Sequence, residues 1–201
     1  MLQACSFKNE IDSNYYCQKL KFSCIQSNKV VYFKTTKGDF KVKLFGKDNP
    51  VTVSNFLENI DNNIYVNQKF YKIINYPQIS FIHGGVNPGN KFYIERNQKL
   101  NKTNHSIPLE IKFKEEMKPR YNYQIKNPDE TENLVNTFES GSIAMVKSGK
   151  NMSSSTEFFF VTSNIPELDG RYSIFGKVIK GLDVLKKINK EDYIKSVQIT
   201  N

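Results

Sequence analysis

The chain has 201 residues, of which 38% are hydrophobic and 13% aromatic, so it can bury the core of one large domain, and wholesale disorder is excluded. No stretch approaches the ~20 apolar residues that a helix needs to cross a bilayer. The formal net charge is +9, but only three of the 29 basic residues are arginine. Because phosphate and base recognition favours the planar arginine fork, we expect no nucleic-acid partner.

Residues 1–28 are polar and irregular, and we expect them to form a tail or a loosely attached extension. All three cysteines lie here. The stretch Leu2-Gln3-Ala4-Cys5 resembles the end of a bacterial lipoprotein signal, which implies lipidation at Cys5, a membrane tether and export to the periplasm. In an exported protein, Cys17 and Cys24 form a pair that can make a disulfide. The alternative is a cytoplasmic protein with three ordinary thiols.

A pattern of period two begins at Lys29. Apolar residues alternate with polar ones over 31–35 and again over 40–44, with a turn at Lys37-Gly38 between them. This pattern predicts a β-hairpin with one face toward water. Asn49 and Pro50 are typical of a helix start, and apolar residues then recur at helical spacing up to position 60.

The rest of the chain predicts short strands around one charged, proline-broken surface excursion at 114–140. A second short helix is expected at 182–188. Many short strands with two helices predict an antiparallel barrel or sandwich in a single domain over 29–201. The remaining strands are expected at 69–74, 79–83, 107–113, 142–147, 157–162, 173–178 and 193–200.

Seven short motifs follow one another in the order found in cyclophilins, the β-barrel family of peptidyl-prolyl isomerases, which the chain therefore resembles over residues 29–200. The resemblance implies a mainly β fold, a closed eight-stranded antiparallel barrel capped by two helices. The motifs are Thr35-Thr36-Lys37-Gly38-Asp39, Pro50-Val51-Thr52-Val53-Ser54-Asn55-Phe56, Phe70-Tyr71-Lys72-Ile73-Ile74, His83-Gly84-Gly85, Gly141-Ser142-Ile143-Ala144-Met145, Phe158-Phe159-Phe160-Val161-Thr162 and the stretch from Leu168 to Val178.

The resemblance also implies an activity: cis-trans isomerisation of prolyl bonds in polypeptide clients, assisting protein folding. Rotation about a prolyl amide crosses a barrier of roughly 18–20 kcal/mol, because it destroys the resonance of the C–N bond. An apolar slot for the proline ring and a donor aimed at the nitrogen stabilise the twisted state, with no metal or cofactor. We expect the protein to act as a monomer.

Several positions that carry this reaction in the family hold other residues here. Lys72 stands where the family has its catalytic arginine, and His83 stands where a glutamine binds the substrate backbone. Lysine keeps the charge but not the planar fork, and a neutral imidazole offers fewer hydrogen bonds than an amide. Among the substrate-binding positions, the departures from the family are Val146, Lys147 and Glu157.

The apolar slot itself is retained. The family's slot positions are occupied here by Phe159, Leu168 and Tyr172. Counting back from His83 places Ser80 at the position of the remaining slot aromatic, so this aromatic is either Phe81, one residue later, or absent. Without the resemblance, the sequence pattern alone would make Phe159 a core residue and Lys72 a residue on a solvated face.

The departures from the family's site residues favour reduced activity or a second hypothesis, a non-catalytic module that binds proline-containing segments as a chaperone or scaffold. A third hypothesis is a basic surface that docks anionic lipid or polymer.

Overall fold

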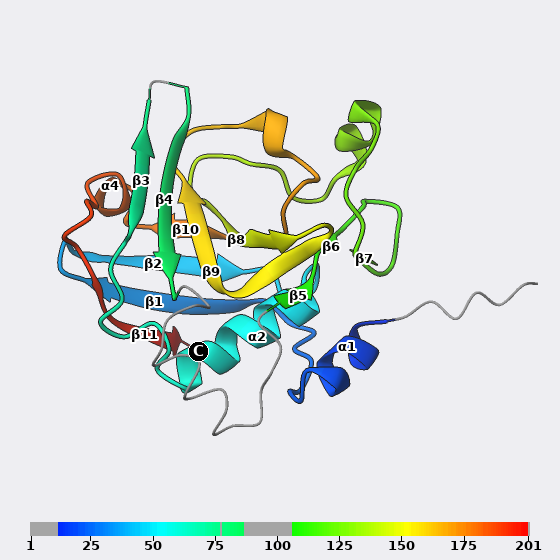
Figure 1. Ribbon diagram of the computed structural model, residues 1–201, viewed down its shortest axis with the longest axis horizontal. Helices are drawn as coiled ribbons and strands as arrows, with labels where there is room; N and C mark the ends of the chain where they lie inside the picture. Colours follow the sequence, from blue (N-terminus) through cyan, green and yellow to red (C-terminus); the bar gives the residue numbers. More distant parts are fainter. Residues whose placement is uncertain (1–11, 77, 87–105, 201) are drawn as a thin grey trace, which may run out of the picture.

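One antiparallel sheet carries most of the chain in the computed structural model, which describes residues 12–76, 78–86 and 106–200 (Figure 1). Eight strands follow one another across it in the order β11-β1-β2-β10-β8-β9-β4-β3, and β5 pairs with β9 beside this path. The strands of this sheet are β1 (Lys29–Thr35), β2 (Asp39–Leu44), β3 (Lys72–Asn75), β4 (Ser80–Gly85), β5 (Ser106–Pro108), β8 (Ser142–Gly149), β9 (Met152–Val161), β10 (Ile174–Lys180) and β11 (Ile194–Thr200).

The sheet curls into a half-barrel that is not fully closed. Its two end strands, β3 and β11, do not pair with each other along their length. The segment before β3 contacts the start of β11 through an isolated bridge between Lys69 and Tyr193. Asn67 N also donates a 2.7 Å hydrogen bond to Ile194 O. The mainly β class and the eight-strand path are confirmed, whereas the predicted closure is incomplete, because within the described residues β3 pairs with β4 but not with β11.

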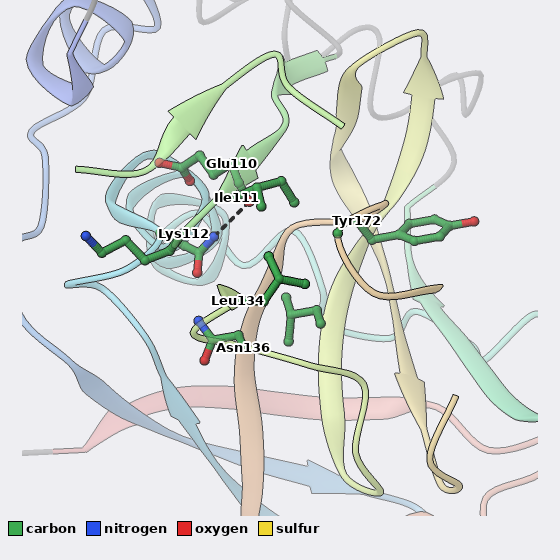
Figure 2. A pocket seen from close by; sticks show the side chains of 9 residues that line it. Glu110, Ile111, Lys112, Leu134, Asn136 and Tyr172 are labelled. Atoms are coloured by element: carbon green, nitrogen blue, oxygen red, sulfur yellow. Dashed lines mark hydrogen bonds between the residues drawn. The ribbon is translucent and has the colours of Figure 1, made fainter. Parts of the chain in front are cut away.

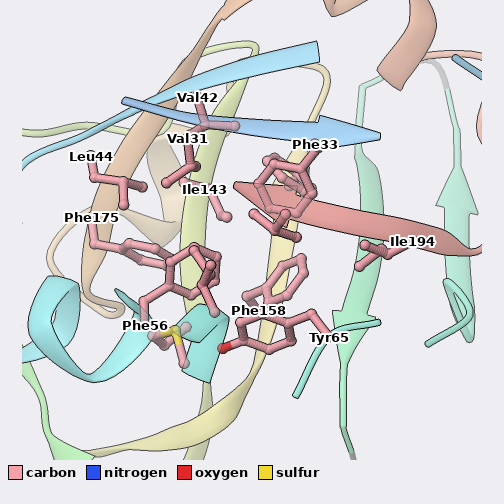
Figure 3. Packing of buried hydrophobic residues seen from close by; sticks show 14 of the residues in the cluster. Val31, Phe33, Val42, Leu44, Phe56, Tyr65, Ile143, Phe158, Phe175 and Ile194 are labelled. Atoms are coloured by element: carbon pink, nitrogen blue, oxygen red, sulfur yellow. The ribbon is translucent and has the colours of Figure 1, made fainter. Parts of the chain in front are cut away.

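The main core fills the inside of the curl (Figure 3). Phe33 and Phe40 stack across the β1–β2 hairpin with ring centroids 4.8 Å apart. Phe56 comes from helix α2 (Pro50–Asp61), which begins at the predicted proline, and meets Phe158 edge to face at 5.7 Å. Burying each phenylalanine contributes about 1.5–3 kcal/mol, so these aromatic contacts hold α2 against the sheet.

The second predicted helix is shorter than expected. Helix α4 covers Leu182–Leu185, and the predicted end at 188 is wrong. Beyond Leu185 the backbone hydrogen bonds tighten from i→i+4 to i→i+3, with Ile188 N bonded to Leu185 O at 3.2 Å. A turn held by Asp192, which accepts from Asn189 N at 2.9 Å, then leads the chain into β11.

The strand predicted at 107–113 is divided between two sheets. Ser106–Pro108 pairs with β9 as β5, and Glu110–Ile111 forms β6, which pairs with β7 (Arg120–Tyr121). Leu109, between the two strands, still donates its N–H to Asn151 O at 3.2 Å, and the chain changes its pairing partner from β9 to β7 just after this residue.

The segment predicted as a surface excursion, residues 114–140, packs as a small substructure. It contains β7 and the 3-10 helix η1 (Pro128–Asn133). A separate apolar cluster joins the segment to β6, with Leu134 bridged to Phe113. The excursion therefore has its own buried residues next to the barrel.

Residues 12–28 are folded against α2, so the expectation of a loosely attached tail is wrong for this part. Helix α1 covers Ser13–Lys19, and a disulfide joins Cys17, which is 2% exposed, to Cys24. Ile25 N donates to Ser54 Oγ in α2 at 2.7 Å. Cys5 lies outside the described residues. Within the described residues, every helix is too short or too polar to cross a membrane.

Glu110 fastens the start of α2 to the rest of the fold. Its carboxylate is fully buried and accepts from Val51 N at 3.0 Å and Thr52 N at 2.6 Å, two of the free N–H groups at the helix start. Asn49 holds the N-cap position but bonds to the backbone oxygen of Glu110 (3.2 Å) instead of the helix. Burial raises the pKa of Glu110 to about 7, against the smaller opposing effect of the hydrogen bonds from Thr52 and Val51.

This burial predicts a pH dependence of stability. The folded chain holds a proton on Glu110 more tightly than the unfolded chain, so the stability from this proton is lost as the pH rises from 4.5 through about 7. In urea unfolding, the free-energy difference between wild type and Glu110→Gln should fall by about 1–3 kcal/mol between pH 5 and pH 8. The matched control is Glu115→Gln, an exposed glutamate, which should follow the wild type. An equal difference at both pH values would contradict the assignment.

Candidate functional site

A second apolar cluster lies on the outer face of the sheet. Successive side chains of a strand point to opposite faces, and in β9 Phe158 and Phe160 belong to the main core while Phe159 belongs to this second cluster. The same alternation places Ala144 of β8 outside, between the inward Ile143 and Met145. The cluster, called here the outer cluster, comprises Phe138, Ala144, Phe159, Val161, Ile165 and Ile174, with Phe81, Val146, Leu168 and Tyr172 packed against it and half-buried.

Phe159 forms the floor of the outer cluster. Its ring is 2% exposed and lies parallel to that of Phe138, with centroids 5.7 Å apart and an interplanar angle of 18°. Tyr172 meets Phe159 edge to face at 5.2 Å. Phe138 N donates to Asp169 Oδ1 at 2.6 Å, which fixes the loop that carries Leu168 beside the same floor. Three separate segments thus build one apolar surface with a solvent-exposed rim.

Of the two candidates for the last slot aromatic, Phe81 lies on the outer face. Its ring is 5.6 Å from that of Phe159 in an edge-to-face contact. Ser80 is buried and accepts a 2.6 Å hydrogen bond from the hydroxyl of Thr162. The alternation of β4 therefore brings Phe81 and His83 to the outer cluster and turns Ser80 away from it.

Lys72 and His83 face each other across the β3–β4 pair. The imidazole stacks on the Phe159 ring at 5.4 Å with an interplanar angle of 22°. Burial, and secondly the positive charge of Lys72, lower the pKa of His83 to about 4, so the ring is neutral at neutral pH. Lys72 is exposed, and within the described chain no carboxylate lies within ion-pair distance of its ammonium.

Glu157 of β9 is paired with Gly85 of β4, the second residue of the double glycine. Tyr71, the neighbour of Lys72, donates its hydroxyl to Glu157 Oε1 at 3.0 Å. Burial and the charge of Glu157 raise the pKa of Tyr71. The glutamate is therefore engaged by a tyrosine that the sequence analysis did not include in the site.

Lys147 lies at the opposite rim, near Tyr172. Its Nζ is 5.1 Å from the centroid of the Tyr172 ring and donates to Gln124 Oε1 at 3.0 Å. Burial, and secondly the charge of Arg171, lower the pKa of Lys147. Val146, its neighbour in β8, packs on the outer cluster.

Besides Tyr71, sequence reasoning missed two residues of the site, Phe138 and Gln124. Both lie in the segment expected to be a surface excursion. A lone phenylalanine just before the strand that starts at Ser142 was the available signal for Phe138. Gln124 gave no signal, because its role depends on a contact with Lys147, 23 residues further along the chain.

A small pocket adjoins the site at Tyr172 (Figure 2). It lies between β6 and the 114–140 segment, and the predicted catalytic residues and Phe159 do not line it. The pocket is therefore distinct from the predicted prolyl slot. Its lining residues are Asn49, Glu110, Ile111, Lys112, Leu134, Asn136, Gly170, Tyr172 and Ile174. Among the described residues, no three His, Cys, Asp or Glu side chains are placed to hold a metal ion.

Fold and site together define a class of protein in which a curled antiparallel β-sheet carries an apolar cluster on its outer face. A model of the family described as cyclophilin type peptidyl-prolyl cis-trans isomerase/CLD matches residues 30–201. A peptidyl-prolyl cis-trans isomerase of Helicobacter pylori is 30% identical over 166 residues, 82% of each chain. One of Acinetobacter baylyi is 29% identical over 167 residues, 81% of this chain and 72% of that protein.

A solved cyclophilin type peptidyl-prolyl cis-trans isomerase of Cryptosporidium parvum has a similar fold. Its TM-score is 0.59 at 24% identity, covering 87% of this chain and 99% of that one. A second structure of the Cryptosporidium protein was determined in the presence of the dipeptide Ala-Pro, with the same TM-score. The chain belongs to the cyclophilin-type family of peptidyl-prolyl cis-trans isomerases, which confirms the resemblance of its motifs.

The lowered pKa of His83 predicts a loss of stability in acid. The unfolded chain takes up a proton near pH 6.5 that the folded chain resists down to about 4, so stability falls as the pH drops through this range. Between pH 7 and pH 5, the wild type should lose about 1 kcal/mol of unfolding free energy relative to His83→Gln, a value that allows for solvent screening. Urea unfolding at both pH values measures it. A constant difference would show that the imidazole titrates alike in both states.

Proposed function

We propose that the chain isomerises Xaa–Pro bonds in extended polypeptide segments bound across the outer cluster. One observation carries the proposal: an apolar surface on the outer face of the barrel has an exposed cation, Lys72, and a neutral histidine, His83, on adjoining strands at its rim. The reaction of the family needs an apolar seat for the proline ring and a donor next to it.

The apolar seat is supported by the half-buried residues Phe81, Leu168 and Tyr172 over the Phe159 floor. A proline ring placed on them removes apolar surface from water, which contributes roughly 25 cal/mol per Å². The floor residue is fixed by stacking on Phe138, so little ordering is required when a client binds.

Lys72 supplies the charged donor in this proposal. When the prolyl amide twists, the nitrogen regains a lone pair, and an N–H aimed at it stabilises that state more than the planar ones. An ammonium rotates freely and is held less firmly than a guanidinium. The neutral His83 beside it can hold the peptide backbone by one donated or one accepted hydrogen bond without repelling the lysine.

Substitution of Lys72 tests the donor. Lys72→Arg should raise the isomerisation rate of a proline peptide, and Lys72→Ala should lower it by about tenfold or more, since loss of one transition-state donor typically costs ~10²–10³ in a rigid site. Exchange NMR on the peptide gives the rate. The matched control is Lys195→Ala, an exposed lysine of β11.

The same experiment separates the two main hypotheses. Equal rates for wild type and Lys72→Ala would show that the lysine is a bystander. Binding of the proline peptide, but not of its alanine-for-proline analogue, with no rate enhancement in any variant would favour the non-catalytic module. Two departures from the family support this non-catalytic alternative. Lys72 stands in place of the catalytic arginine, and His83 stands in place of the glutamine that binds the substrate backbone.

We further propose that the protein works in a non-reducing compartment, outside the cytoplasm. The Cys17–Cys24 disulfide supports this, because such bonds persist mainly in oxidising environments. Alkylation of the protein as taken from its cells, before and after reduction, should reveal two protected thiols. Two reactive thiols at 17 and 24 would contradict the proposal. A lipid tether at Cys5 and a monomeric state stay predictions.

A further inference from the structure

The 114–140 segment reaches the edge of the outer cluster at Gln124 and Ile125. Ile125 N donates to Gly170 O at 3.1 Å, in the loop that links Leu168 to Tyr172. Gly170 has φ +67°, and a Cβ there would lie 2.1 Å from Ile125 Cδ1. The segment is therefore closely fitted to this loop, and it places Gln124 beside Lys147.

Two cations gather at this edge. Lys147 holds its ammonium over Tyr172, and Arg171 is the residue immediately before that tyrosine. Lys147 is partly removed from water, and the charge of Arg171 adds to this, so the charged form of Lys147 is less favourable than in water. Among the described residues, no carboxylate forms an ion pair with either side chain. The edge thus concentrates positive charge without neutralising it.

Within the part of the chain that the structure describes, the hydrogen-bond donors at this edge are also only partly paired. One of the three N–H groups of Lys147 is taken by Gln124 Oε1. Three sets of donors are left: the other N–H groups of the Lys147 ammonium, the amide N–H groups of Gln124 and the guanidinium of the exposed Arg171. Such donors bind a negatively charged acceptor most strongly. A carboxylate has two oxygens for such donors and balances the charge of the pair.

We propose that Gln124, Lys147 and Arg171 form a subsite for the carboxylate of an aspartate or glutamate that lies within two residues of the client's proline. The inference rests on the proposed function, because Tyr172 is both a wall of the prolyl slot and the support of the Lys147 ammonium. An extended chain advances about 3.3 Å per residue, and Lys147 Nζ is 5.1 Å from the Tyr172 ring, which fits a spacing of one or two residues.

Matched peptides test the subsite. Glutamate is placed in turn at each of the two positions before and after the proline of an otherwise neutral alanine peptide, and each is compared with glutamine at the same position. At one position at least, the glutamate peptide should bind about threefold to tenfold more tightly, as expected for a partly exposed charge-assisted contact. The preference should shrink at high salt, because the charges remain partly in water.

Variants assign the preference to the subsite. Lys147→Met should abolish most of it, and Lys147→Glu should reverse it toward a lysine peptide. Arg171→Gln, which changes an exposed side chain, should reduce it and carries the test if the Lys147 variants do not fold. The matched control Lys43→Met removes an exposed lysine from β2 and should keep the preference.

The outcomes distinguish this inference from the function on which it rests. Equal affinities for glutamate and glutamine peptides at all four positions, with proline still preferred over alanine, would overturn the subsite alone. A preference that survives Lys147→Met and Arg171→Gln would assign it elsewhere and also overturn the subsite. Failure to distinguish proline peptides from their alanine analogues would overturn the proposed function, and the subsite with it.

Discussion

The two-residue period of β9 is the constraint on which the rest of the structure depends. It divides three consecutive phenylalanines between two faces, with Phe158 and Phe160 in the main core and Phe159 outside. A sheet with one core face usually presents polar residues on the other. Here the outer face is also apolar, so loops must cover part of it. The part left uncovered is the surface on which a proline ring can be seated.

The covering loops explain why the site is rigid at its floor and open at its rim. Phe138 stacks on Phe159 and, through Asp169, fixes the loop bearing Leu168. Tyr172 completes the wall at the end of the same loop. His83 shares strand β4 with Phe81, whereas Lys72 lies on β3 at the end of the sheet. The proposed donor therefore comes from a strand that contributes no residue to the outer cluster.

The sequence predicted those features that depend on neighbours along the chain. Alternation located the strands, and it predicts which residues of β4 share a face once the register is known, so Phe81 rather than Ser80 joins the outer cluster. The break at Leu109 and the early end of α4 were not predictable in this way, because each depends on a hydrogen bond that competes with the local pattern. The incomplete closure of the barrel was not predictable either, because it depends on which strands β3 and β11 pair with at the two ends of the sheet.

Contacts between distant residues account for what sequence reasoning missed. Glu110 holds the start of α2 from 58 residues away at Thr52, and Gln124 meets Lys147 across 23 residues. No short motif contains both members of either pair. Residue types gave little help either, since a glutamate in a charged stretch is usually solvated. The buried state of Glu110 follows only from the tertiary contact between β6 and the start of α2.

These distant contacts share one stretch of chain, from Leu109 to Phe138. At its beginning Glu110 satisfies the N–H groups of α2, in its middle Gln124 and Ile125 meet the slot loop and Lys147, and at its end Phe138 supports the slot floor. This stretch, most of which was predicted as the surface excursion at 114–140, therefore connects the helix that closes the core to the outer cluster. Under the proposed function, changes in this stretch are expected to affect stability and client binding together, whereas changes at Lys72, on the strand pair at the end of the sheet, are expected to affect the chemistry alone.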